Sequence, residues 1–204
     1  MRAQRVGRKE IPADGHDDMT GDFGSLNKKT ERFIMGADCS TKSFAFSVFD
    51  NGSLIKWGEI TFKGNTVFER LADGQKKVRL LKQQFKVDRV VIESAVFVQN
   101  KKTVILLAYS FGAIIAALID GGAVVEEVSP LVWQRAIQNP PLTKPEKQAI
   151  VDANPDKSKA WYTNANRLFR KHRTRVWVRD TYGIDIDNDN VTDAIAIAGS
   201  RFIA

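Results

Sequence analysis

The run Arg32-Phe33-Ile34-Met35-Gly36-Ala37-Asp38 decides the fold, because it is an apolar stretch that ends in a carboxylate. A second apolar run, Asp88 to Glu93, ends in the same way. A third acid, Asp193, lies near the start of the helical pattern at 189–198. A charged residue that closes a buried strand is exposed where a ligand can reach it. Three carboxylates from distant parts of the chain can therefore converge on a cation.

These three carboxylates predict a particular chemistry. Hard divalent cations such as Mg²⁺ prefer oxygen ligands and usually keep part of their water shell. Two such ions about 4 Å apart can activate a water and stabilise the leaving oxygen of a phosphodiester. Asp38, Glu93 and Asp193 together therefore predict a metal-dependent nuclease, although each of them alone would more often be a surface group.

Length and composition indicate one domain with its own core, since 43% of the 204 residues are hydrophobic. The single cysteine, Cys39, excludes an intrachain disulfide. It also favours a reducing compartment, so the cytoplasm is expected. The most apolar stretch, 104–119, contains Tyr109, Ser110 and Gly112 and is short for a membrane span, so no membrane partner is expected.

Basic side chains concentrate in one quarter of the chain. Residues 1–31 hold six basic and six acidic side chains, whereas residues 135–180 hold eleven basic and four acidic ones. Such a block is typical of a surface that binds a polyanion such as DNA. Trp161 and Phe169 interleave with the charges, which favours contacts to bases. The alternative is that these aromatic side chains seat a helix whose charged face is merely solvated.

The hydrophobic pattern predicts an α/β domain. Asp50-Asn51-Gly52 is a hairpin signal, so the first three strands should be antiparallel. Strands are expected at 33–37, 43–49, 54–62, 89–93 and 123–128, and helices at 68–85, 103–120, from Thr143 onward, at 158–179 and at 190–202. Asp73-Gly74 could interrupt the first helix. The result is a mixed five-stranded sheet with helices on both faces, preceded by a flexible extension at 1–31.

Three segments together carry a resemblance to a known family: Ile34-Met-Gly-Ala-Asp38-Cys-Ser-Thr41 with its hairpin, Val90-Val-Ile-Glu93-Ser-Ala-Val-Phe97, and Asn190-Val-Thr-Asp193-Ala-Ile-Ala-Ile-Ala198. They resemble the RuvC family, Holliday-junction resolvases with the ribonuclease H fold. The resemblance covers about residues 33–198 and implies a nuclease domain at 32–204, with a basic helical insertion at about 151–180. It also implies a homodimer that cuts four-way junctions or other branched DNA. The expected cofactor is Mg²⁺, with two ions per site and Mn²⁺ as a substitute.

Carried over by position, the resemblance implies that Asp38, Glu93 and Asp193 are catalytic metal ligands. The family's fourth ligand falls on Asn190, an amide in place of an acid, and Asp189 is the neighbouring alternative. An amide oxygen can still bind a hard cation, but it contributes no charge. Both residues could instead simply cap the helix.

Further positions carry less specific expectations. Lys147 resembles the family's basic residue near the scissile phosphate, against the alternative of an ordinary exposed lysine. Phe97 falls where the family places an aromatic that wedges into the opened junction, against the alternative of a core residue. The residues expected to bind DNA are Phe97, Arg170, Lys171, Arg173 and Arg175.

Two other functions compete with a resolvase. An actin-like kinase or ATPase also opens with Asp-x-(Gly/Ser)-Thr on a strand before a hairpin, but that fold needs two lobes and a longer chain. A ribonuclease-H-like protein that binds branched nucleic acid without cutting it is the other alternative, favoured by the amide at Asn190. ATP turnover would identify the first of these, and a failure to nick a junction with Mg²⁺ the second.

Overall fold

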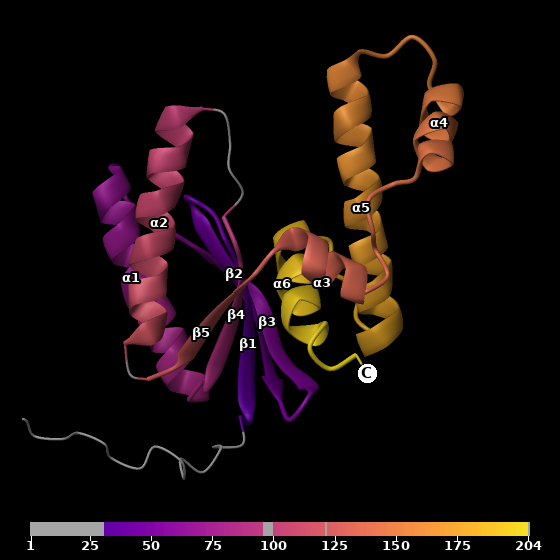
Figure 1. Ribbon diagram of the computed structural model, residues 1–204. Helices are drawn as coiled ribbons and strands as arrows, with labels where there is room; N and C mark the ends of the chain where they lie inside the picture. Colours follow the sequence, from indigo (N-terminus) through magenta and orange to yellow (C-terminus); the bar gives the residue numbers. More distant parts are fainter. Residues whose placement is uncertain (1–30, 96–99, 121, 204) are drawn as a thin grey trace, which may run out of the picture. The chain divides into compact units, whose positions relative to one another are not determined.

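The computed structural model describes residues 31–95, 100–120 and 122–203. Strands and helices alternate after an initial group of three strands, as Figure 1 shows. The elements are β1 (Phe33–Cys39), β2 (Ser43–Asp50), β3 (Ser53–Thr61), α1 (Val67–Phe85), β4 (Arg89–Glu93), α2 (Lys101–Ile119), β5 (Val124–Val128), α3 (Pro130–Ala136), α4 (Lys144–Ala153), α5 (Lys159–Tyr182) and α6 (Asp189–Gly199).

The five strands form one mixed sheet in the order β3-β2-β1-β4-β5. Strands β1, β2 and β3 are antiparallel neighbours, whereas β4 runs parallel to both β1 and β5. The turn between β2 and β3 has Asn51 at φ 47° and Gly52 at φ 86°. Positive φ at both central residues is the requirement of a type I′ hairpin turn. The predicted hairpin and the predicted mixed sheet are both confirmed.

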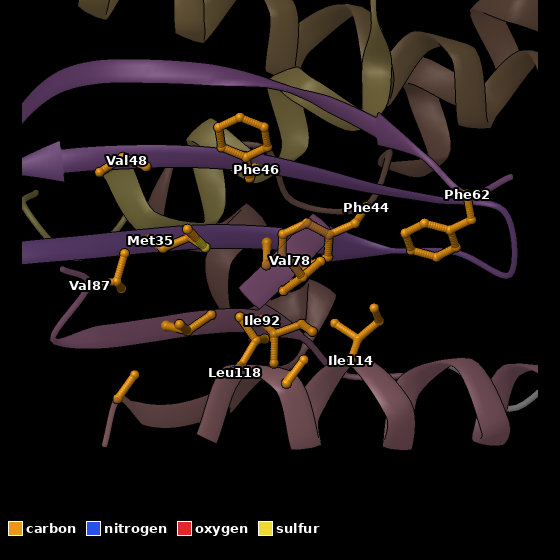
Figure 2. Close-up of a cluster of buried hydrophobic side chains, with 14 residues drawn as sticks. Met35, Phe44, Phe46, Val48, Phe62, Val78, Val87, Ile92, Ile114 and Leu118 are labelled. Atoms are coloured by element: carbon orange, nitrogen blue, oxygen red, sulfur yellow. The ribbon is translucent and has the colours of Figure 1, made fainter. Parts of the chain in front are cut away.

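Helices α1 and α2 cover one face of the sheet (Figure 1). Alternate side chains of the central strands, such as Met35, Phe44 and Ile92, meet Val78 of α1 and Ile114 of α2 in a fully buried cluster, drawn in Figure 2. Burying a large aliphatic or aromatic side chain contributes about 1.5–3 kcal/mol, so this layer is a major source of stability.

Helix α1 runs unbroken through the Asp73-Gly74 pair. Gly74 is buried, and a Cβ at this position would lie 2.9 Å from ring atoms of Phe62. The glycine therefore permits close packing of the helix on the sheet. The predicted interruption of the helix at Asp73-Gly74 does not occur.

Helix α2 is long and apolar enough to cross a membrane, contrary to the expectation from residues 104–119. Within the domain, however, its buried side chains include Ile114, Ala117 and Leu118, which belong to the core beneath the sheet. A core helix satisfies the same length and composition criterion, so the criterion alone does not indicate a membrane partner. Its outward side chains Ile105 and Tyr109 are about half exposed.

Helix α6 covers the opposite face of the sheet and is itself covered by α3 and α5 (Figure 1). All residues of α6 from Val191 to Gly199 are buried. They pack against Ala45 and Phe49 of β2 on one side and against Val178 of α5 and Trp133 of α3 on the other. This sandwiched position explains why the helix is apolar nearly all round.

Most predicted elements form within a few residues of their expected bounds. The capping box at Thr143 and Glu146 begins α4, as predicted. The short helix α3 was not predicted, because Pro130 to Ala136 is too brief to show a helical period.

Candidate active site

Two carboxylates lie at the same end of neighbouring parallel strands. Asp38 is near the end of β1 and Glu93 ends β4. The register pairs Ala37 with Ile92, so Asp38 and Glu93 occupy the next position along the two strands. Since strand side chains alternate, both point away from the α1–α2 core, which holds Ala37 and Ile92, and toward the face covered by α6.

Helix α6 approaches β1 closely at Gly36, and this contact places the third carboxylate. A Cβ at Gly36 would overlap the carbonyl oxygen of Ala194 and lie 2.8 Å from the Cβ of Ala198. The same carbonyl accepts a 2.8 Å hydrogen bond from the Ser47 hydroxyl of β2. Asp193 immediately precedes this anchored residue, so its position is set by the backbone contact at Gly36.

The three carboxylates line one cavity of about 540 Å³, together with side chains from the helices outside the sheet. The polar residues of the cavity wall include Asp38, Glu93, Asn190 and Asp193, with Lys147 of α4 and with Arg170 and Lys171 of α5. The structure thus places Asn190 and Lys147 in the same cavity as the carboxylates, while their roles as ligand and catalytic residue stay predictions.

Burial and mutual repulsion raise the pKa values of all three acids. Burial raises the pKa of Glu93 to about 7, and the neighbouring charges of Asp38 and Asp193 add to the effect. Burial also raises the pKa of Asp193 to about 6, against the opposing charge of Lys171. Burial raises the pKa of Asp38, where Lys171 again opposes it. Clustering buried carboxylates costs free energy because their ionised forms are disfavoured. Such a cluster is typical of a functional site.

The chemistry of the cluster suits a hard divalent cation, although its geometry here is not closed around one. One carboxylate oxygen of Asp193 is buried and has no hydrogen-bond partner, while the other accepts from the Lys171 ammonium. Among the residues that the structure describes, no three acidic, histidine or cysteine side chains are grouped closely enough to hold a metal ion. The donors are carboxylate and amide oxygens, the kind that Mg²⁺ prefers, but the three carboxylates would have to move closer together to bind it.

Asn190 and Asp189 differ in where they point. The Asn190 amide nitrogen donates a 3.1 Å hydrogen bond to Glu59 of β3, and Asn190 lines the cavity. Asp189 accepts a 2.8 Å hydrogen bond from Arg175 and is not part of the cavity wall. Asn188 carries out the capping that the sequence assigned to either of them, since its side chain accepts from the backbone of Asn190 and Val191. The geometry thus favours Asn190 as the fourth position.

Comparison with known proteins identifies the family. The family described as crossover junction endodeoxyribonuclease RuvC matches residues 34–151, a segment that contains Asp38, Glu93 and Lys147. The chain belongs to the RuvC family. RuvC-family proteins are endonucleases that depend on a divalent metal.

Curated relatives and solved structures agree with this assignment. RuvC of Aliarcobacter butzleri is 31% identical over 108 residues, which span 51% of this chain and 70% of the relative. RuvC of Campylobacter concisus is 25% identical over 122 residues, 58% of this chain and 78% of the relative. The structure of T. thermophilus RuvC with a Holliday junction substrate superimposes with a TM-score of 0.62 at 15% identity, covering 84% of this chain and 92% of that one. This likeness confirms the ribonuclease H-like fold.

Helix α5 lies beyond the segment matched to the RuvC family, yet it forms one wall of the cavity. Arg170 and Lys171 of this helix face the carboxylates. Arg173 pairs with Glu146 and stacks over the Phe169 ring, with its guanidinium carbon 4.8 Å from the ring centroid. Four basic residues were expected to bind DNA. Arg170 and Lys171 are in the site, whereas Arg173 already forms an ion pair with Glu146.

Arg175 is the fourth of these basic residues, and it is paired as well. Its guanidinium contacts Asp189 at 2.8 Å and Asp187 at 3.3 Å, so it braces the segment that leads into α6. The remaining expected residue, Phe97, lies outside the described residues.

Arg170 lines the cavity and has two donor atoms without a partner among the described residues. Both atoms, Nε and Nη2, are buried. These two nitrogens form the edge that binds a carboxylate or a phosphate in a bidentate manner. Buried charged donors are rarely left unpaired in proteins. The guanidinium is therefore prepared for an oxyanion.

Two residues of the site were not predicted from the sequence. The indole Nε1 of Trp133 donates a 2.8 Å hydrogen bond to Glu93, and the Trp133 side chain is fully buried. Glu59 accepts from Asn188 and Asn190. A tryptophan in an unpredicted helix and a glutamate on an edge strand carry no motif, so only the fold reveals their contacts.

Proposed function

We propose that this RuvC-family chain is a Mg²⁺-dependent endonuclease that resolves Holliday junctions and related branched DNA by hydrolysing phosphodiester bonds. The observation that supports the proposal is a single cavity lined by three carboxylates and by the basic side chains of Lys147 and Arg170. Metal-assisted cleavage of DNA needs acids that hold the metal and cations that hold the phosphate. Here both kinds of side chain line one cavity.

In this proposal Asp38, Glu93 and Asp193 hold the metal, with the amide oxygen of Asn190 as the fourth ligand. Two Mg²⁺ ions per site, or Mn²⁺ as a substitute, would supply an activated water and stabilise the leaving oxygen. Because Asn190 brings no charge, the site carries one negative charge fewer than a set of four acids.

Neighbouring residues orient these ligands. Trp133 directs its indole N–H at Glu93, which restricts the rotation of this carboxylate. Glu59 engages the nitrogen of the Asn190 amide, which leaves the amide oxygen available to a cation. Partners of this kind restrict a ligand's orientation before the metal binds.

The basic groups of the wall bind the substrate. We propose that Arg170 holds a phosphodiester through its Nε and Nη2 edge and that Lys147 stabilises the charge that develops on the scissile phosphate. The helical segment at about 151–180 would then be a basic insertion that extends the DNA-binding surface. Arg173 and Arg175 contribute mainly by bracing that segment, and Phe97 stays a proposed contact to an unstacked base.

A homodimer suits the reaction, since productive resolution requires two symmetric cuts and hence two sites related by a twofold axis. The exposed apolar side chains of Ile105 and Tyr109 on α2, with Phe68 of α1 beside Tyr109, offer a self-complementary surface. We propose this surface as the dimer interface. Sedimentation with and without junction DNA tests it, and a monomer that produces only single nicks in a cruciform plasmid would contradict it.

Cleavage of a synthetic four-way junction, beside a linear duplex of the same sequence, tests the proposed activity. We expect junction-specific products with Mg²⁺ and none with EDTA. Asp38→Asn should abolish cleavage while binding to the junction in Ca²⁺ persists. Asp185→Asn removes an exposed acid ahead of α6 and is the matched control for charge.

The outcome also decides between the remaining alternatives. A wild-type chain that binds junctions but never nicks them with Mg²⁺ or Mn²⁺ would be a branched-DNA-binding protein that has lost catalysis. Cleavage by Asp38→Asn at the wild-type rate would refute the assignment of the site. Membership in the RuvC family argues against the actin-like ATPase alternative.

A further inference from the structure

Lys171 is placed among the acids of the cavity, at some distance from the exposed basic surface. It lies on α5, outside the segment matched to the RuvC family, and its ammonium forms an ion pair with Asp193. Only 17% of the Lys171 side chain and 8% of the Asp193 side chain are exposed. A pair this buried is strongly coupled, and the loss of either partner leaves an uncompensated charge.

The charge of Lys171 reaches more than one acid. Its side chain lines the same cavity as Asp38, Glu93 and Asp193, and its ammonium pairs with Asp193. In keeping with that position, its charge opposes the rise in pKa at all three acids. Lys171 therefore supplies a positive charge that partly compensates the cluster.

A divalent ion would compete with this ammonium. Among the described residues, the second carboxylate oxygen of Asp193 has no hydrogen-bond partner, so a metal bound there would lie beside the ammonium that the first oxygen accepts from. Two cations held by one buried carboxylate repel each other. Lysine suits such a temporary partner, since its flexible four-carbon stem lets the charge move while the backbone of α5 stays in place.

We infer that Lys171 is a resident counter-cation, which holds the three acids together in the metal-free protein and is displaced from Asp193 when a divalent ion binds. The inference rests on the proposed metal site and adds a regulation to it. Lys171 lowers the affinity for the metal, and it keeps the three acids of the metal-free site from repelling one another apart.

Mg²⁺ titrations of the DNA-free protein test this, with thermal stability as one readout and calorimetry as the other. In EDTA, Lys171→Met should melt at a lower temperature than wild type, because Asp193 loses its partner. Its midpoint for Mg²⁺ should fall by about tenfold or more, because metal binding no longer has to break a buried ion pair. Lys159→Met, an exposed lysine at the start of the same helix, is the matched control and should leave both readouts unchanged.

Two further variants distinguish the effect of charge from loss of folding and from a change in packing. Lys171→Gln keeps a hydrogen-bond donor to Asp193 without the charge and should also bind Mg²⁺ more tightly than wild type. Combining Lys171→Met with Asp193→Asn should recover the melting temperature in EDTA that the single Lys171 variant loses. Recovery identifies charge compensation, since the lost methylene and ammonium contacts are the same in both variants.

The outcomes separate this inference from the proposed function. An Mg²⁺ midpoint that is unchanged or higher in both Lys171 variants, with a normal response in wild type, would overturn the counter-cation role and leave the nuclease intact. A wild-type protein whose stability and heat signal do not respond to Mg²⁺ would remove the metal site, and the inference with it.

Discussion

Replacing Glu93 by glutamine should stabilise the metal-free protein while it removes nuclease activity. The carboxylate is largely buried beside Asp38 and Asp193, and its pKa in the folded chain is about 7, against an ordinary value of 4.5. A raised pKa means that the folded state disfavours the ionised form. Glutamine has nearly the same shape, and its carbonyl can still accept the hydrogen bond from Trp133.

The sign and size of the effect follow from the two pKa values. The unfolded chain ionises Glu93 near pH 4.5 and the folded chain only near pH 7, so stability is intact below the first value and is lost as the pH rises through the second. With about 1.4 kcal/mol for each pKa unit, ionisation of Glu93 costs the folded state about 3 kcal/mol at pH 8 and about 1 kcal/mol at pH 5. Glu93→Gln recovers these amounts.

The assay is urea unfolding of wild type and Glu93→Gln in EDTA, at several pH values between 5 and 8. We expect the variant to be more stable throughout, with an advantage that grows with pH. Glu127→Gln changes an exposed glutamate on the adjacent strand β5 and should show no such growth. Saturating Mg²⁺ should narrow the difference, because wild type then gains the stabilisation of a bound ligand.

One result would refute this reasoning. If Glu93→Gln is less stable than wild type at pH 8 in EDTA, the carboxylate is a net source of stability through Trp133 and Lys171. The burial and repulsion that define the site would then be smaller than these attractive contacts.

Three other predictions address the packing, the substrate contacts and the ligand orientation. Gly36→Ala should destabilise the domain by at least about 3 kcal/mol in urea unfolding, because the new Cβ overlaps the backbone of α6, a greater strain than ordinary overpacking; equal stability would contradict the close approach. Arg170→Ala should reduce the slope of log affinity for DNA against log salt by about one unit, whereas Arg175→Ala, whose partners are acids of the same chain, should leave the slope unchanged and lower stability. Trp133→Phe removes the hydrogen bond that lowers the pKa of Glu93. The acid limb of the cleavage pH profile should therefore move to higher pH, and an unmoved limb would show that Glu93 needs no such partner.

The sheet could be predicted because its signals are local. The alternation of residues 43–49 and the Asn51-Gly52 turn depend only on neighbours in the chain, and each is found where the pattern indicates. The ends of the apolar runs located Asp38 and Glu93 at the ends of two strands, and the structure places both in one cavity, where they are largely buried. Their role as metal ligands stays a prediction.

Packing between distant segments decided the rest. The Asp73-Gly74 pair in α1 is ambiguous in sequence, and it is resolved by the ring of Phe62, which packs against Gly74. In the same way, neither Trp133 nor Glu59 belongs to a motif, and each is recognisable as a partner of the site only through its hydrogen bond.

The basic block at residues 135–180 shows most clearly what composition predicts and what only the tertiary structure determines. Its composition alone indicated a partner of negative charge, because net charge needs no coordinates. Which charges remain available for that partner depends on short-range contacts. Arg173 and Arg175 are paired with acids, and Lys171 is buried against Asp193. Arg170 lines the cavity with two donor atoms that have no partner among the described residues. Electrostatic interactions act through space at distances of a few ångströms, so only the fold decides which lysine or arginine meets an acid of its own chain and which is left for DNA.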